Sequence, residues 1–104
     1  MQSVSALLKR VPTGLLINSE FVSCAEKLDV FDRSSGQVLT QIGQASCEQV
    51  DQAVQVGLQS YKEVWQYTSA MERQDFLYKL ALKVEEHKNY ISQLEVLDSG
   101  KPIA

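Results

Sequence analysis

The spacing of apolar residues changes once along this chain, at Gly43, and that change constrains the fold more than any other feature. Before Gly43, short apolar runs alternate with turn-forming residues, which is typical of strands and hairpins. After it, apolar residues recur at steps of three and four, which is typical of amphipathic helices. The sequence therefore predicts an α/β chain with β-hairpins over residues 14–43 and helices over residues 46–100.

Two hairpins, or a short meander, are expected in the first half. Asn18-Ser19-Glu20 should form the first turn, because asparagine tolerates the positive φ that a tight hairpin needs. Asp32 to Gly36 should form the second, because Asp, Ser and Gly close turns through side-chain bonds or positive φ. The strands that flank these turns are expected at residues 15–17, 21–22, 28–31 and 38–42.

Two or three amphipathic helices should follow. Ser46 with Gln49, and Ser69 with Glu72, have the spacing of capping boxes and predict two helix starts. The polar stretch at residues 85–89 predicts a break, with Asn89 as a cap for a third helix. Gly100 and Pro102 predict the final helix end, and the expected apolar positions are Val50, Ala53, Val54, Gly57, Leu58, Tyr61, Val64, Trp65, Phe76, Leu77, Leu80, Ala81, Val84, Ile91, Leu94 and Leu97.

These elements are not expected to make a complete domain. A two-stranded hairpin is marginally stable by itself, and the apolar helix faces need a further layer to cover them. The chain also stops at Ile103-Ala104, directly after the predicted helix end. Residues 1–13 are expected to be a flexible lead-in, since Lys9 and Arg10 are too few charges to favour an organelle-targeting segment.

Composition excludes several classes of protein. With 104 residues the chain is one domain at most, and no apolar run approaches the length of a membrane span. A net charge of −3 with interleaved acids and bases argues against a nucleic-acid surface. Cys24 and Cys47 form neither a disulfide framework nor a CxxC metal motif, which favours a cytoplasmic location.

No residue has the setting of a catalytic or cofactor-binding group. Cys47 should lie in the first turn of a helix, where a thiolate is favoured, but no histidine is near it in sequence. Cys24 lies in a link between strands, and His87 is expected on a solvated face. The five glycines are too scattered for a phosphate loop. Asp98 is unusual, because an acid near a helix C-terminus is unfavourable unless something compensates its charge.

Several segments in order resemble landmarks of the aldehyde dehydrogenase family. Residues 94–102, LEVLDSGKP, resemble that family's LETLDSGKP string. The other matching segments are residues 16–22 (LINSEFV, family FINGEWV), 30–38 (VFDRSSGQV, family xxNPATGEV), 50–54 (VDQAV, family DVDRAV) and 72–81 (ERxxxLxxLA). Asp32 and Arg33 depart from the family's Asn-Pro.

The resemblance implies the N-terminal part of a Rossmann-type NAD(P)-binding domain. It also implies oxidation of an aldehyde to its carboxylic acid through a cysteine nucleophile, in a homodimer or homotetramer. The family's nucleophile and its other catalytic and cofactor-binding groups would lie beyond this chain, so no activity is expected from the chain alone. Residues 68–73, TSAMER, lean towards the betaine aldehyde dehydrogenase branch.

One site is implied within the chain itself. Many family members hold K⁺ or Na⁺ near the end of this helix, and the corresponding ligands are Asp98 and the main-chain oxygens of Val30 and Phe31. Hard oxygen ligands suit such an ion. The alternative to an enzyme segment is a standalone, non-catalytic helical module that binds itself or a full-length paralogue through its apolar faces.

Overall fold

A computed structural model describes residues 3–102 of the protein, and its mixture of strands and helices confirms the expected α/β class. Residues 1–2 of the expected lead-in and residues 103–104 of the expected cofactor-binding segment lie outside the described residues. In chain order the elements are α1 (Val4–Lys9), β1 (Leu15–Ile17), β2 (Glu20–Val22), β3 (Glu26–Phe31), β4 (Val38–Gln44), α2 (Cys47–Glu63), the 3₁₀ helix η1 (Trp65–Tyr67), α3 (Ala70–Glu86) and α4 (Lys88–Ser99).

Both predicted hairpins are confirmed. β1 pairs antiparallel with β2, and the two residues between them, Asn18 and Ser19, have φ angles of 53° and 63°. Positive φ at both central positions is the geometry of a type I′ turn, which matches the twist of the flanking strands. Glu20 belongs to β2 and pairs with Ile17 rather than lying in the turn. β3 pairs antiparallel with β4, with an irregular register between Val30 and Phe31.

Both predicted capping boxes are confirmed. The Gln49 N–H donates to the Ser46 hydroxyl at 3.2 Å, and the Ser46 N–H donates to Gln49 Oε1 at 3.0 Å. At the start of α3 the corresponding distances between Glu72 and Ser69 are 3.1 and 2.8 Å. Each box satisfies two backbone N–H groups that a helix start otherwise leaves without partners. Local sequence alone therefore sets where α2 and α3 begin.

Acid should weaken the start of α3 through Glu72. The N–H of Ser69, followed by its hydroxyl, holds the pKa of the Glu72 carboxyl below its ordinary value. Because the folded pKa is depressed, the stabilisation is full above the unfolded pKa and is lost as pH falls through the folded pKa. Glu72→Gln keeps an acceptor oxygen that does not titrate in this range, so helix content followed by circular dichroism should fall less between neutral and acidic pH. If the native and Glu72→Gln proteins lost equal helix content on acidification, the loss would not come from the Glu72 carboxyl.

The break between α3 and α4 is confirmed, but the prediction that Asn89 caps α4 is wrong. His87 ends α3 and precedes Lys88, the first residue of α4, and Asn89 lies inside the helix. His87 makes no side-chain cap bond to α4, because its Nδ1 lies 2.9 Å from the Lys83 carbonyl oxygen of the preceding turn. The other end of α4 is as expected, since Gly100 has φ 76° and its N–H donates to Val96 O at 2.9 Å.

A helix occupies much of the segment for which the sequence predicts a flexible lead-in. The Ser3 hydroxyl accepts from the Ala6 N–H at 3.2 Å and caps α1. Leu7 on α1 is 1% exposed, and the Arg10 guanidinium stacks over the Tyr90 ring of α4 at 3.8 Å from the ring centroid. The cation–π contact joins the end of α1 to α4, and the burial of Leu7 shows that α1 packs against other parts of the chain. These contacts come from the far end of the chain, which is why no local pattern indicated them.

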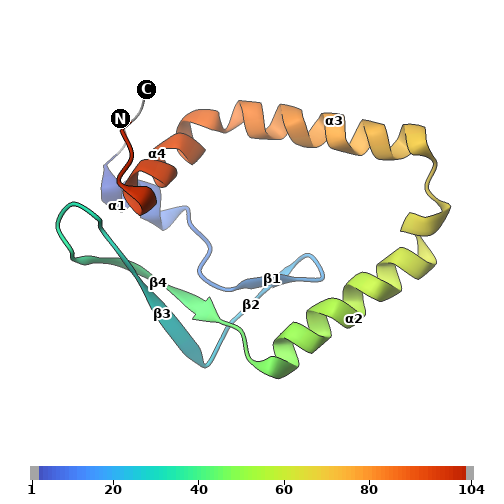
Figure 1. Ribbon diagram of the computed structural model, residues 1–104, viewed down its shortest axis with the longest axis horizontal. Coiled ribbons are helices and arrows are strands. Elements are labelled where there is room, and N and C mark those ends of the chain that lie inside the picture. Colours follow the sequence, from blue (N-terminus) through green and yellow to red (C-terminus); the bar gives the residue numbers. More distant parts are fainter. Residues whose placement is uncertain (1–2, 103–104) are drawn as a thin grey trace.

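The described elements form an open ring rather than layers packed around one core. α2, η1 and α3 form one arc, and the hairpins with α1 and α4 form the other (Figure 1). The radius of gyration is 17.2 Å, against about 13 Å expected for a compact domain of this length. Leu7 and Ile17 are the only buried apolar residues among residues 3–102. The elements are thus set by local bonds and hairpin pairing, with little shared core.

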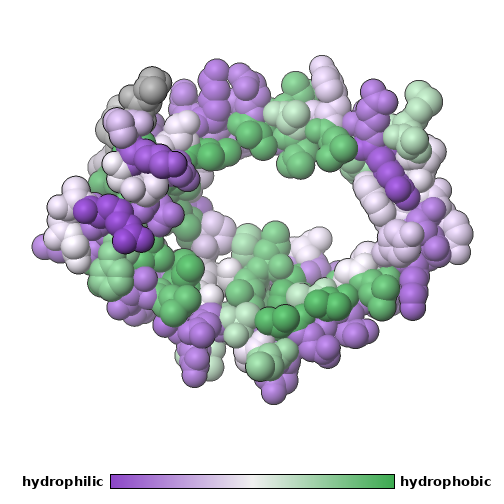
Figure 2. All heavy atoms as spheres, in the orientation of Figure 1, coloured by the Kyte–Doolittle hydropathy of each residue, from purple (hydrophilic) through white to green (hydrophobic). Residues whose placement is uncertain are grey.

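The apolar helix faces are left uncovered in the described part of the chain, as expected. Hydrophobic residues follow the edge of the central opening along α2 and α3 (Figure 2). We call these residues the inner rim, and they are Val50, Val54, Leu58 and Tyr61 of α2 with Phe76, Leu80 and Val84 of α3, all exposed. Their spacing of three and four places each set on one helix face. Among residues 3–102, no helix combines the length and apolar character that crossing a membrane needs.

Candidate functional site

The end of α4 meets the β3–β4 hairpin, and this is where the predicted site residues lie. Asp98 is in the last turn of α4, while Val30 and Phe31 end β3. Asp98 and Val30 line one cavity of about 260 Å³ between α1, α4 and the hairpin. The remaining lining residues are mostly aliphatic, namely Leu8, Val11, Leu39, Thr40, Ile42, Leu94 and Leu97. The structure therefore brings together residues that the resemblance pairs across a long stretch of sequence.

The turn between β3 and β4 is closed by its own side chains. Asp32 accepts bonds from the Ser34 N–H at 3.0 Å and from the hydroxyls of Ser34 and Ser35 at 2.9 Å each. The Ser34 N–H is the largest of several hydrogen-bond causes that lower the pKa of the Asp32 carboxyl. The Gly36 N–H donates to Asp32 O at 2.8 Å, and Gly36 takes φ 75°. Asp32 thus supplies the turn chemistry that the resemblance places on an asparagine.

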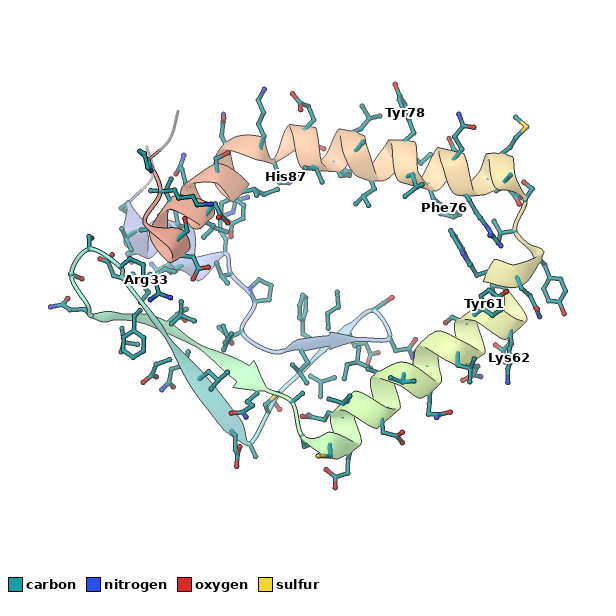
Figure 3. All side chains as sticks on the ribbon, viewed as in Figure 1. Arg33, Tyr61, Lys62, Phe76, Tyr78 and His87 are labelled. Atoms are coloured by element: carbon teal, nitrogen blue, oxygen red, sulfur yellow. The ribbon has the colours of Figure 1, made fainter. Side chains whose placement is uncertain are left out.

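Arg33, the second departure from the family pattern, reaches from this turn to α4. Its Nε donates to the main-chain oxygen of Asp98 at 3.3 Å (Figure 3). Its stem lies against Gly100, where an added Cβ would come within 3.2 Å of Arg33 Cβ. Gly100 is therefore required both for its positive φ and for this close approach.

A free monovalent cation fits this site only in part. Asp98 and Val30 lie on one cavity, but that cavity has few polar atoms to complete an oxygen shell. A guanidinium already donates to the Asp98 carbonyl, so a positive charge is present there. Within residues 3–102, no three His, Cys, Asp or Glu side chains gather as a metal cluster. Cation binding by Asp98, Val30 and Phe31 stays a prediction.

The other candidate residues lie apart from this site. Cys47 is exposed at the first position of α2, and Cys24 is half-buried beside Gly43. His87 is exposed at the α3–α4 junction (Figure 3). Lys88 donates to Glu85 at 3.0 Å on the exposed surface. The described structure does not bring these side chains together.

The aromatic residues near η1 form a cluster at one end of the inner rim. The Trp65 and Phe76 rings are 5.8 Å apart between centroids and tilted by 47°. The Arg73 guanidinium lies 5.2 Å from the Trp65 ring centroid and donates to Trp65 O at 2.8 Å. Phe76 and Tyr61 point towards the central opening, whereas Tyr78 and Lys62 point away from it (Figure 3). This cluster fixes the angle between α2 and α3, and hence the rim's shape.

Sequence reasoning missed three contacts that arginine residues make with other elements. Arg33 is conspicuous only as a departure from the family pattern, and Arg10 only as part of a short basic pair. Arg73 belongs to the matching segment at residues 72–81, but its contact with Trp65 depends on how η1 turns the chain. Spacing cannot indicate such contacts, since each joins different elements.

The sequence and the fold of this chain both match known proteins. The model of the "Aldehyde dehydrogenase family" matches residues 21–104. An aldehyde dehydrogenase of Agaricus bisporus is 35% identical over 94 residues, which are 88% of this chain and 19% of that protein. A Bacillus cereus aldehyde dehydrogenase structure has a TM-score of 0.86 and 33% identity, and covers 95% of this chain and 21% of its own.

A second solved structure shares the fold at lower identity. It is the betaine aldehyde dehydrogenase of Staphylococcus aureus in complex with NAD⁺, with a TM-score of 0.88 and 24% identity. The match covers 92% of this chain and 20% of that one. The chain thus spans about a fifth of the length of the relatives it matches. The hairpins and helices are those of the N-terminal part of that fold, and the chain belongs to the aldehyde dehydrogenase family.

Proposed function

We propose that these residues serve as the N-terminal segment of an NAD(P)-dependent aldehyde dehydrogenase, an oxidoreductase that converts an aldehyde to its carboxylic acid. The match of the family model along residues 21–104 carries the proposal. In it, the catalytic and cofactor-binding groups lie outside these 104 residues. The chain's own part is structural: it wraps the inner rim around the rest of the cofactor-binding domain.

The described residues do not fit a dinucleotide by themselves. Phosphate groups favour helix N-termini without acidic side chains, preceded by glycine-rich loops. Here Glu48 and Glu72 occupy the first turns of α2 and α3, and the glycines are scattered. In the proposal, NAD or NADP therefore binds elsewhere in the enzyme. The choice between the two cofactors is left to residues that contact the ribose.

The uncovered rim supports a structural part for these residues. Seven apolar side chains of α2 and α3 are exposed around one opening, and contiguous exposed apolar surface marks a contact with other protein. The proposal requires that a further part of the enzyme cover the inner rim. In the relatives, the rest of the protein is several times longer than this chain.

Finer features remain predictions within this proposal. Residues 68–73 favour betaine aldehyde as substrate, and the S. aureus enzyme shares the fold. A homo-oligomer, a cytoplasmic location and a monovalent cation on Asp98, Val30 and Phe31 follow from the resemblance in the same way.

The proposal is tested on the protein isolated from its own cells. An antibody raised against residues 46–63 captures the native polypeptide, whose mass is measured by mass spectrometry. Aldehyde-dependent formation of NADH or NADPH is then followed by absorbance, with betaine aldehyde beside short aliphatic aldehydes. We expect a polypeptide several times heavier than 11.7 kDa with this activity.

The second candidate is a non-catalytic module, and the same rim favours it. An 11.7 kDa polypeptide without NAD(P)⁺ reduction, bound to itself or to a full-length paralogue, would replace the enzyme proposal with this one. The two candidates differ in the mass of the captured chain and in whether hydride transfer occurs.

A further inference from the structure

The C-terminal end of α4 carries more negative charge than its own residues neutralise. The last carbonyls of a helix are its negative pole, and cations near them are stabilising. The last turn of α4 has no basic residue, and it contains Asp98. Gly100 donates its N–H to Val96 O at 2.9 Å, and the Ser99 hydroxyl donates to Glu95 O at 2.7 Å. Lys101 follows the helix, but within residues 3–102 its Nζ makes no hydrogen bond to the last carbonyls of α4. The Asp98 carbonyl therefore takes its cationic partner from another element.

Arg33 supplies that charge from a position 65 residues away in sequence. Its Nε donates to Asp98 O at 3.3 Å, and its stem packs against Gly100 (Figure 3). The turn that presents Arg33 is closed by bonds of Asp32 and Gly36, so its shape does not depend on Arg33. A guanidinium stays protonated at all ordinary pH values, so the charge is permanent.

We propose that Arg33 is a built-in counter-charge for the α4 C-terminus, and that it holds residues 98–102 in place without a bound monovalent cation. The guanidinium acts where the resemblance places K⁺ or Na⁺, and it replaces an uncharged proline of the family pattern. A second cation beside it would be repelled, and the mostly aliphatic cavity offers that cation few oxygens. Arg33 is a positioning residue, and the inference stands whether or not the proposed oxidation is correct.

Hydrogen exchange in the full chain tests this inference. Deuterium uptake of a peptide spanning residues 95–101 is measured by mass spectrometry, in potassium chloride and in tetramethylammonium chloride of equal concentration. The native chain should exchange equally in both salts. Arg33→Met keeps a stem of similar shape but loses the charge, and it should exchange roughly two- to fivefold faster in tetramethylammonium. Potassium should leave that faster exchange unchanged, because the mostly aliphatic cavity offers a free cation few oxygens.

Arg33→Lys is the matched control, because it keeps the charge on a stem of similar length. The deuterium uptake of residues 95–101 in the Arg33→Lys chain should be the same in both salts. Three results would overturn the inference: native exchange that potassium slows more than about twofold, an Arg33→Met chain that exchanges at the native rate, or an Arg33→Lys chain that exchanges as fast as the Arg33→Met chain. The first would show that the site holds a free cation despite Arg33.

Discussion

Replacing Leu80 by aspartate should destabilise the full protein by at least about 3 kcal/mol if the inner rim is covered as proposed. Leu80 lies one helical turn from Phe76 on the rim face of α3, and it is 58% exposed in the described chain. If Leu80 stayed this exposed in the full protein, the substitution would change the unfolding free energy only slightly. Covering the rim would bury a carboxylate among apolar side chains, which is far more costly. Urea-induced unfolding followed by tryptophan fluorescence measures the difference in unfolding free energy.

Leu82→Asp is the matched control on the same helix. Leu82 is 53% exposed, so its exposure in the described chain is nearly that of Leu80. It lies one turn from Tyr78, which points away from the opening (Figure 3). The change at Leu82 should therefore stay within about 0.5 kcal/mol of the native protein. If Leu80→Asp is equally mild, the rim is open to water in the working protein, and the proposal that it packs against a larger domain fails.

Gly43→Ala should destabilise the protein by about 1–3 kcal/mol, as overpacking does elsewhere. A Cβ at Gly43 would lie 2.6 Å from Cys24 Sγ and 3.1 Å from Cys24 Cβ. The thiol can rotate, but the Cys24 Cβ cannot. The strand cannot move away freely either, because the Gly43 N–H donates to Thr13 O at 2.8 Å. Thermal unfolding of the full protein followed by circular dichroism measures the effect.

Two further variants show whether the loss comes from this contact. Adding Cys24→Ala to Gly43→Ala should recover part of the stability, because it removes the sulfur and leaves the Cβ. Gly57→Ala adds the same methyl group to α2, where no atom outside the helix's own backbone lies within 4 Å in the described chain. Gly57 shares a helix face with the inner rim, so this variant is compared in the 104-residue chain, where the higher helix propensity of alanine should raise the helix content. A Gly43→Ala protein that melts as high as the native one would mean that β4 does not pack on Cys24 as described.

The features that sequence reasoning predicted correctly are those whose partners lie close together in the chain. The two capping boxes join residues three apart, and the Asn18-Ser19 turn depends on the φ preferences of adjacent residues. Gly100 ends α4 for the same local reason. Two local details were wrong. Glu20 pairs with Ile17 in β2 instead of lying in the turn. Asn89 does not cap α4, since a cap position depends on where the preceding helix ends, and His87 bonds back to Lys83 O.

The candidate site was predicted only through resemblance. Asp98, Val30 and Phe31 were named because several segments in register match one family. Nothing in their spacing brings the end of α4 to the end of β3. The structure places Asp98 and Val30 on one cavity, but it also adds Arg33, which the resemblance counted as a departure.

The sequence by itself determined the class of strands β1 to β4 and of helices α2, α3 and α4, the residues at which α2 and α3 start, the two hairpin turns and the apolar face that became the inner rim. Hydrogen bonds across a few residues and side-chain periodicity decide these, and both can be read locally. Only the tertiary structure decided that the elements form an open ring, that Leu7 is buried and Arg10 stacks on Tyr90 of α4, and that Arg33 reaches Asp98. Those contacts join residues far apart in the chain, so they depend on how whole elements are placed, which no local pattern specifies.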